Sequence, residues 1–308
     1  MSDVHVRLFR RGDREQLTEL VNAHAAAVVP GLSISVSTVL SQLERQPDEF
    51  VVDPWVAERR TLVAEQHQRV AAAAHLLRYA QDDRVSVSYR DSGEIRWLVF
   101  WPDKAGDATG AAEQLMTACL GLLDGWAVSS QSAAGDLPVP GVFGVPAQWA
   151  HVRALYERSG FRHVGHTELV YLARVEHLAR PPAPVPGLSV QRSVGSSGTR
   201  FSAVLSDEVV GYLEIEIFHG GERRSRHSGW ADIGNLGVGA AYRRRGIATW
   251  LLGQAAGWLE LAHVDRLLAY TYAEGSDETG QSYDEDRAFL QALPFAELTR
   301  TKSGWKRS

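Results

Sequence analysis

The sequence has little cysteine and no excess of basic residues. Its 308 residues include a single cysteine, Cys119, so no internal disulfide can form. Cys119 lies in the apolar run 115–120, which indicates a small buried side chain and favours a reducing, cytoplasmic location. The 32 lysine and arginine residues are outnumbered by 37 aspartate and glutamate residues, giving a net charge of −5. This balance disfavours a dedicated nucleic-acid-binding protein, whose domain usually has a basic excess.

Long apolar runs are also missing. No window approaches the roughly 18 uninterrupted apolar residues of a membrane helix, and residues 1–7 lack a basic-then-apolar signal. We therefore expect neither export nor a membrane partner. What is present is ordinary for a folded protein, with 44% hydrophobic and 22% charged residues. At roughly 150 residues per domain, the length predicts about two domains.

Proline is concentrated in one place. Four prolines stand between positions 181 and 186, which forbids a helix and favours an extended spacer. We place the domain boundary there, with a first domain at 1–178, a linker at 179–187 and a second domain at 188–308.

Hydrophobic periodicity predicts strands and helices in both halves. In the first half, Asp13 is expected to cap the first helix. The expected strands are 4–10, 55–64, 69–79, 85–89, 95–101 and 161–173, and the expected helices 13–28, 37–45, 110–123 and 147–159. In the second half, the expected strands are 188–194, 200–205, 209–218, 231–238, 266–272 and one near 298, with helices from 246 and over 282–293.

The two halves therefore repeat an order of strands, helix, strand, helix, strand. In the second half, only residues 195–199 connect the first two strands, where the first half has two helices. These patterns predict an α+β fold of two tandem domains, each a mixed, mostly antiparallel sheet flanked by helices, with the second domain trimmed of its first two helices.

The most informative stretch is 236–252, where a strand ends, a short turn follows and a helix opens. Backbone N–H groups and the positive end of the helix dipole converge there, which suits a pyrophosphate. Gly246 lets the backbone approach the anion, Ala248 stays small, and Arg243 adds a charge-assisted contact. The alternative is a solvated arginine run, 243–245, that opens an ordinary amphipathic helix.

These residues resemble the acetyl-CoA loop of the Gcn5-related N-acetyltransferase (GNAT) superfamily, Arg/Gln-x-x-Gly-x-Gly/Ala. Arg243, Gly246 and Ala248 match this pattern, and Ala240 stands where the family usually has proline. The resemblance implies acetyl-CoA as co-substrate and no metal. It implies donor contacts from Leu236, Gly237, Val238, Arg243, Arg244, Arg245, Gly246, Ile247, Ala248 and Thr249.

The first half matches the family in a different place. Residues 154–161, Ala-Leu-Tyr-Glu-Arg-Ser-Gly-Phe, are similar to the Leu-Tyr-x-x-x-Gly-Phe helix end of these enzymes, with Tyr156 in the tyrosine position. Its own donor loop has Ala105, Ala108 and Gly110 where the pattern has Arg, Gly and Gly/Ala, so the arginine and the first glycine are missing. The second half has Leu290 in the tyrosine position and Pro294 in the glycine position, so its usual general acid is missing. We therefore expect the second domain to bind acetyl-CoA and the first to be structural or to shape the acceptor site.

Acetyl transfer to an amine needs a base, because an amine with a pKa near 10 is protonated at neutral pH. Asp232 precedes Val238 by six residues, where histone-type relatives have a glutamate, and Glu94 takes the corresponding place in the first half. A solvated carboxylate at a strand end is the alternative for Asp232. The backbone N–H of Val238 is expected to polarise the thioester carbonyl.

Other candidates stay open. Tyr283 and Tyr272 are candidates to replace the missing tyrosine as general acid. The alternative for each is ordinary packing in the fold. Glu214 and Glu216 point off the core face and line either an acceptor cleft or a solvated face. Six acids lie between 274 and 286, where they either attract a cationic amine or belong to the capping box that begins at Ser282.

The resemblance implies an N-acetyltransferase, an acyltransferase of the EC 2.3.1 type. It would transfer acetyl to a primary amine of a small molecule or peptide by direct transfer in a ternary complex. The alternatives are a catalytically silent CoA-binding or regulatory protein and, least favoured, a nucleic-acid binder that uses Arg223, Arg224, Arg226 and residues 302–307. Monomer and homodimer are both compatible with the sequence.

Overall fold

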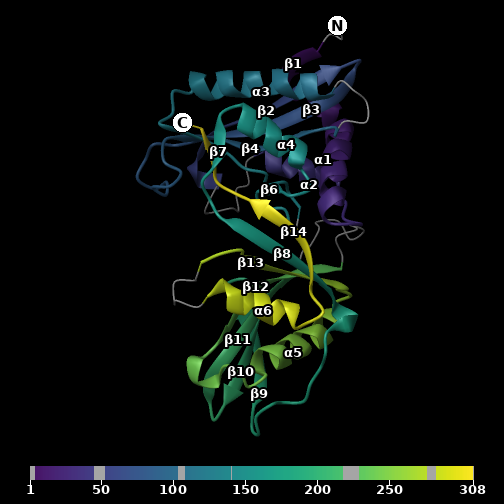
Figure 1. Cartoon of the computed structure of the whole chain (residues 1–308), viewed down its shortest axis with the longest axis vertical. Helices are drawn as coiled ribbons and strands as arrows, with labels where there is room; N and C mark the ends of the chain where they lie inside the picture. Colours follow the sequence, from purple (N-terminus) through teal and green to yellow (C-terminus); the bar gives the residue numbers. More distant parts are fainter. Residues whose placement is uncertain are drawn as a thin grey trace. The chain divides into compact units, whose positions relative to one another are not determined.

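The computed structural model describes residues 4–44, 53–102, 108–139, 141–217, 229–275 and 282–307 (Figure 1). The chain forms two compact units. Unit 1 consists of Met1–Glu168 and Thr299–Ser308, and unit 2 of Leu169–Leu298.

Unit 1 is built on a seven-stranded sheet in the order β1-β2-β3-β4-β5-β15-β7. Neighbouring strands are antiparallel except β4 and β5, which are parallel. The interior strand β3 is buried from Val70 to Leu77, a run of alanine, valine and leucine interrupted only by His75, as expected where both faces of a sheet are covered. The strands are β1 Val4–Leu8, β2 Val56–Gln66, β3 Arg69–Tyr79, β4 Ser92–Phe100, β5 Ser130–Ala133, β7 Phe161–His163 and β15 Trp305–Arg307. The helices are α1 Arg14–Val28, α2 Val36–Leu43, α3 Ala108–Gly125 and α4 Ala150–Arg158.

The second sheet has the order β6-β14-β8-β13-β12-β11-β10-β9. Its strands are β6 Val145–Pro146, β8 Thr167–Arg174, β9 Ser189–Gly195, β10 Gly198–Leu205, β11 Glu208–Ile217, β12 Trp230–Val238, β13 Arg266–Tyr272 and β14 Ala296–Lys302. Unit 2 also has helices α5, Ile247–Leu261, and α6, Tyr283–Gln291. The predicted apolar stripe of α5 is buried at Ile247, Leu251 and Ala255, where the helix packs on β10, β11 and β12.

The predicted fold class is confirmed. Each unit has a mixed sheet flanked by helices, and the fully described segment 189–205 passes from β9 to β10 through Ser196 and Ser197 alone. The two helices that precede β2 in unit 1 have no counterpart between those strands.

The division into units differs from the predicted boundary at 179–187. Strand β8 precedes the prolines but lies in the second sheet between β14 and β13, and β15 at the far end of the chain completes the sheet of unit 1 between β5 and β7. Periodicity predicts that a strand exists but not which sheet it joins. The proline-rich segment also packs on α5, because a Cβ at Gly253 would lie 2.8 Å from the Ala179 carbonyl oxygen.

Several local expectations were wrong. Residues 85–89 form turns and not a strand, although Val85 is buried beneath Leu77 and Tyr79. The Asp13 side chain does not cap α1, because it accepts a hydrogen bond from the Arg10 N–H and pairs with Arg7 at 2.7 Å. That guanidinium lowers the pKa of Asp13. The short strands β5, β6 and β15 were not predicted.

Cys119 is fully buried in α3, as predicted, and burial raises the pKa of its thiol. Among the described residues, no helix is long and apolar enough to cross a membrane.

Trp305 gives a test of the role of β15. Its side chain is 1% exposed and packs edge-on against Tyr156. We expect Trp305→Ala to lower the free energy of unfolding by about 3–5 kcal/mol, as for other buried tryptophans, and to speed hydrogen exchange in β5 and β7. Urea denaturation and hydrogen exchange measure both effects. Lys306→Ala, on the exposed side of β15, is the matched control, and an equal loss in both variants would contradict this role.

Candidate functional site

The segment after β12 forms an open helix N-terminus. A 3-10 turn, Ala240–Tyr242, leads into the arginine run, and Gly246 is the N-cap of α5 in the left-handed conformation, with φ of 81°. Only glycine adopts this φ without strain, which explains the residue type. No side chain caps this end of the helix. The N–H groups of the first turn and the positive end of the helix dipole are therefore available to an anion.

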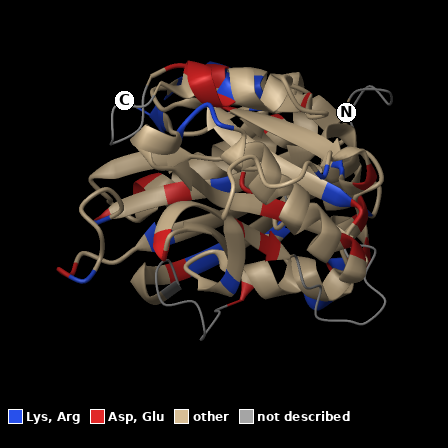
Figure 2. Cartoon of the chain, turned by 90° about the horizontal axis from the view of Figure 1, so that it is seen from below, with Lys and Arg blue, Asp and Glu red and all other residues tan. Residues whose placement is uncertain are grey.

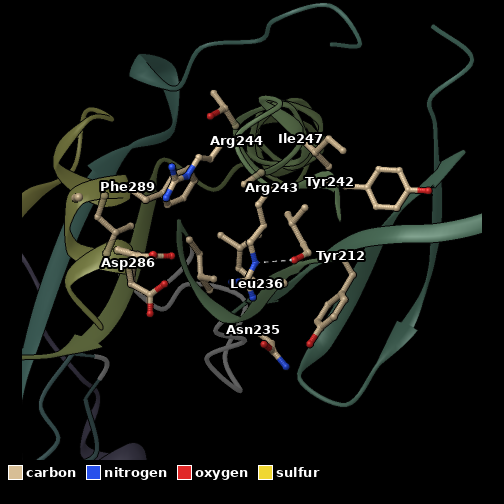
Figure 3. Close-up of a pocket in the computed structure, with 18 of the residues that line it drawn as sticks. Tyr212, Asn235, Leu236, Tyr242, Arg243, Arg244, Ile247, Asp286 and Phe289 are labelled. Carbon is tan, nitrogen blue, oxygen red and sulfur yellow. Dashed lines mark hydrogen bonds between the residues drawn. The ribbon is translucent and has the colours of Figure 1, made fainter. Parts of the chain in front are cut away.

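A cavity of about 1170 Å³ lies in front of this helix end (Figure 3). All its lining residues belong to unit 2 and come from six places: β11, β12 from Ile233 onward, the arginine turn, the first turn of α5, β13 and α6. Every predicted donor residue lines it except Arg245, whose guanidinium lies 5.6 Å from the centre of the Tyr242 ring. The lining residues are Tyr212, Ile233, Gly234, Asn235, Leu236, Gly237, Val238, Ala240, Tyr242, Arg243, Arg244, Gly246, Ile247, Ala248, Thr249, Ala269, Tyr270, Glu285, Asp286, Ala288, Phe289 and Leu290.

The cavity continues between two strands that part. β12 and β13 are parallel neighbours, but they pair only from Trp230 to Asp232, although β12 continues to Val238 and β13 to Tyr272. On its other side, the β12 register with β11 shifts and leaves Gly234 without a partner, which is a β-bulge that bends the strand. The gap that opens beyond Asp232 is lined from both strands.

The backbone of Val238 faces this gap. The Gly239 N–H donates to the Val210 carbonyl on β11 at 2.9 Å. Since successive backbone groups of a strand point to opposite sides, the N–H and C=O of Val238 point toward β13. The Val238 carbonyl accepts a hydrogen bond from Arg243 Nε at 3.2 Å, drawn as a dashed line in Figure 3, which fixes the turn on the strand.

Asp232 lies at the last paired position before the strands part. It is 8% exposed, its Oδ1 has no hydrogen-bond partner among the described residues, and it stands opposite Glu216 on β11. Burial, and to a smaller extent the charge of Glu216, raises the pKa of Asp232 to about 7. Asp232 does not line the cavity itself but directly precedes Ile233, which does.

Helix α6 closes the cavity with both apolar and acidic side chains. Leu290, which the sequence resemblance assigns to the tyrosine position, is 5% exposed and lines the cavity together with Phe289. Glu285 and Asp286 line it as well, and the close-up shows Asp286 on the α6 side of the cavity, across from the arginine turn (Figure 3). Of the other predicted acids in this region, Asp277 and Glu278 lie outside the described residues.

Three tyrosines line the cavity, Tyr212, Tyr242 and Tyr270, and neither of the predicted candidates, Tyr272 and Tyr283, is among them. Tyr283 does not line the cavity and packs on Tyr272, with ring centroids 5.1 Å apart. Tyr270 on β13 lines it. Strand alternation places Tyr270 and Tyr272 on the same face, but only the point where the strands part brings Tyr270 to the cavity.

Unit 1 places its candidates in packed surroundings. Glu94 is 7% exposed and accepts a hydrogen bond from the Tyr79 hydroxyl at 2.8 Å, and burial raises the pKa of Glu94. Tyr156 is fully buried and donates to the Ala134 carbonyl at 2.8 Å. Ala105 lies outside the described residues. The described Ala108 and Gly110 form the first turn of α3.

Metal ligands do not gather in the described chain, because no group of three or more histidine, cysteine, aspartate or glutamate side chains lies close enough to hold an ion. Acidic and basic positions are interspersed along the elements (Figure 2). Arg223, Arg224 and Arg226, proposed above for nucleic-acid contacts, lie outside the described residues.

Comparison with known proteins gives one family. The family model described as "Acetyltransferase (GNAT) family" matches residues 172–278. These residues include the arginine turn, α5 and Asp232. No curated protein matches the sequence.

Solved structures extend the likeness to the whole chain. A tandem GNAT protein from the clavulanic acid biosynthesis pathway aligns over 99% of this chain and 98% of its own, with a TM-score of 0.67 and 14% identity. A GCN5-related N-acetyltransferase from Sphaerobacter thermophilus covers 99% of this chain and 95% of its own, with a TM-score of 0.58 and 17% identity. A GCN5-related glucosamine N-acetyltransferase region of a fungal multi-domain β-N-acetylglucosaminidase aligns over 99% of this chain and 38% of its own, with a TM-score of 0.62 and 15% identity.

The buried carboxyl of Asp232 predicts a pH-dependent stability. Its pKa rises from an ordinary value of 3.8 to about 7, so the folded chain holds this proton more tightly than the unfolded chain. Asp232 should therefore reduce the free energy of unfolding progressively as the pH rises from about 4 to 7, by up to about 4 kcal/mol, and by a constant amount above that.

We expect Asp232→Asn to be more stable than the wild type at pH 8 and to lose this advantage near pH 4. Urea denaturation between pH 4 and 8 measures the difference. Glu208→Gln, an exposed carboxylate on β11, is the control. A difference between Asp232→Asn and the wild type that does not change with pH would contradict the raised pKa.

Proposed function

We propose that this chain is an acetyl-CoA-dependent N-acetyltransferase whose donor site lies in unit 2, because the GNAT family model matches residues 172–278 and the fold aligns with that of a tandem GNAT protein. The observation that carries the proposal is a single cavity that runs from the uncapped N-terminus of α5 into the gap between β12 and β13. The helix N-terminus suits the pyrophosphate of the donor, and the gap between the strands suits its thioester. The cavity joins these two environments in one site.

The residues present fit such a donor. The N–H groups of Ile247, Ala248 and Thr249 would bind the pyrophosphate, with the charge of Arg243 beside them. The Val238 N–H would donate to the thioester carbonyl oxygen, where a preorganised donor contributes a few kcal/mol to the barrier reduction. Acetyl-CoA supplies the activated acyl group, and no metal takes part in the proposed reaction.

Asp232 would act as the base. With a pKa raised to about 7 by burial, it is substantially ionised at neutral pH and can accept, through a water, the proton of the acceptor amine. The amine nitrogen bonds to the carbonyl carbon as the C–S bond breaks, and the CoA thiolate leaves. A thiol with a pKa near 8.5 needs little help to leave, so Leu290 in place of a tyrosine is compatible with turnover. Tyr270, which lines the cavity, is the side chain we propose to protonate the thiolate, and the proton that the new amide nitrogen loses restores the Tyr270 hydroxyl.

The acceptor is a primary amine of a small molecule or peptide. Glu216, Glu285 and Asp286 add negative charge near the site, which favours a cationic amine. One structural relative is described as a glucosamine N-acetyltransferase region, so amino sugars belong in the amine screen. The single cysteine supports a cytoplasmic location. Either a monomer or a homodimer would serve.

A catalytically silent CoA-binding protein is the second candidate. The observations that favour it are Leu290 in the tyrosine position of unit 2 and the packed surroundings of Glu94 and Tyr156 in unit 1.

Ala248→Asp tests the donor site. Position 248 is in the first turn of α5, where an acidic residue suits the helix dipole, so folding should be unaffected or improved by about 0.3–1 kcal/mol. The same carboxylate would repel a pyrophosphate. We expect one acetyl-CoA site per chain by isothermal titration and at least a 100-fold loss of affinity in the variant. Gln254→Glu, later on the same helix, should bind normally, and unchanged binding by Ala248→Asp would contradict this donor site.

Asp232→Asn tests the base and separates the two candidate functions. We expect kcat for amine acetylation to fall by about 100-fold or more, within the range of general base catalysis, while the Kd for acetyl-CoA stays within twofold. Initial rates of thiol release with a panel of amines measure turnover. If Asp232→Asn turns over at the wild-type rate, Asp232 is not the base. If the wild type binds acetyl-CoA and acetylates no amine in the panel, the silent binder is the better description.

A further inference from the structure

We propose that the turn between β9 and β10, Gly195–Gly198, forms the acceptor-side wall of the unit 2 cavity and takes the place of the two missing helices. Glu214 fastens this turn to the sheet. The inference rests on the proposed function and deepens it, because it names the segment that would contact the amine.

The turn is shaped to fold down onto the sheet. It has two central residues, Ser196 and Ser197, and is followed by Gly198 with φ of 84°, which favours glycine. A Cβ at Gly195 would lie 2.6 Å from Glu214 Oε1, and a Cβ at Gly198 would lie 2.4 Å from the Ile215 carbonyl oxygen. Gly198 is therefore needed for the turn to approach β11 this closely, and a side chain at Gly195 would require the Glu214 carboxylate to shift.

Glu214 holds the turn in place. Its side chain is 1% exposed, although the carboxylate lies on the polar face of β11. It accepts hydrogen bonds from Ser196 Oγ at 2.9 Å and from the Ser197 N–H at 3.2 Å, and Arg200 Nη1 lies 3.2 Å away. Burial acts to raise the pKa of Glu214, but these bonds and the Arg200 charge outweigh it and lower the pKa. The carboxylate thus remains ionised and bound to the turn at neutral pH.

The fastened turn adjoins residues that line the cavity, although none of its own four residues does. A Cβ at Gly234 would lie 2.5 Å from the Ser197 Cβ, so the turn rests on the bulge of β12, and Gly234 lines the cavity. Arg200 connects it to a second lining residue, since its guanidinium lies 3.9 Å from the centre of the Tyr212 ring. The Tyr212 ring in turn lies over Gly237.

The position relative to the donor makes this an acceptor wall. Helix α5 packs on the opposite face of β11 and β12, and the proposed pyrophosphate site is at its N-terminus. The amine must therefore approach the gap from the polar face, which bears Glu216, Asp232 and the turn. On that approach the Ser197 side chain is placed to contact the acceptor.

A cysteine at position 197 tests the inference. The chain has one cysteine, Cys119, which is fully buried, so Ser197→Cys introduces a single reactive thiol. The folded variant is labelled with N-ethylmaleimide and assayed for acetyl-CoA binding and for transfer to the amine that the unlabelled wild type uses best. We expect at least a tenfold fall in amine kcat/KM after labelling, with the Kd for acetyl-CoA within twofold. Ser193→Cys, exposed on β9, is the matched control and should keep both properties after labelling.

Each alternative outcome has a separate meaning. Unchanged transfer by labelled Ser197→Cys would overturn the acceptor wall, and lost acetyl-CoA binding would overturn it as well, because the turn would then belong to the donor side. A wild type that acetylates no amine, measured before any variant, would overturn the proposed function and the wall with it.

Glu214→Gln in the Ser197→Cys background tests the fastening. Loss of the charge should free the turn, so maleimide should react several-fold faster than with Ser197→Cys alone, and the amine KM of the unlabelled double variant should rise with kcat unchanged. An unaltered reaction rate and KM would overturn the role of Glu214 as a positioning residue.

Discussion

The parting of β12 and β13 is the constraint on which the rest of unit 2 depends. Two parallel strands normally satisfy each other's backbone groups along their whole length. Here pairing ends at Asp232, and the bulge at Gly234 bends β12 away. The Val238 backbone then faces an opening, and α5 begins where that opening meets the surface. A cavity with polar backbone groups on its wall follows from this one break in the sheet.

In unit 1, the described residues at the corresponding positions have protein partners. Its parallel pair, β4 and β5, is extended beyond the strands by hydrogen bonds from Ala134 to Ile95 and from Asp136 to Arg96. The buried Tyr156 hydroxyl donates to the Ala134 carbonyl, and Tyr79 donates to Glu94. Glu94 and Tyr156, which match catalytic positions by sequence, thus form hydrogen bonds with other protein groups in a packed interior. Among the described residues, the two carboxyl groups differ in this respect: Glu94 accepts a hydrogen bond from Tyr79, whereas Asp232 Oδ1 has no partner.

The sequence was informative wherever local spacing decides the structure. The arginine turn, the N-terminus of α5 and the strand before it were found because a strand end, a glycine and an apolar stripe follow one another within about twenty residues. Sheet membership was not predictable in this way, since β8 and β15 join sheets far from where the chain order suggests. For the same reason, the sequence pattern did not predict Tyr270 or the turn at Ser197 as part of the site. Their positions depend on where two strands part and on a carboxylate, Glu214, that is distant in sequence.

Two buried carboxylates in unit 2 differ in their hydrogen-bond partners, and this difference distinguishes a structural role from a chemical one. Glu214 and Asp232 lie on the same face of neighbouring strands, and both are almost completely buried. Glu214 has donors and a guanidinium, so its pKa falls and its charge holds a turn in place. Asp232 is buried with an oxygen that has no partner among the described residues, and Glu216 stands opposite it, so the pKa of Asp232 rises to about 7. Burying a carboxylate without a donor costs stability, and a pKa near the working pH is what proton transfer requires of a base. Burial of Asp232 therefore lowers the stability of the fold at the position where the proposed reaction needs a base with a raised pKa.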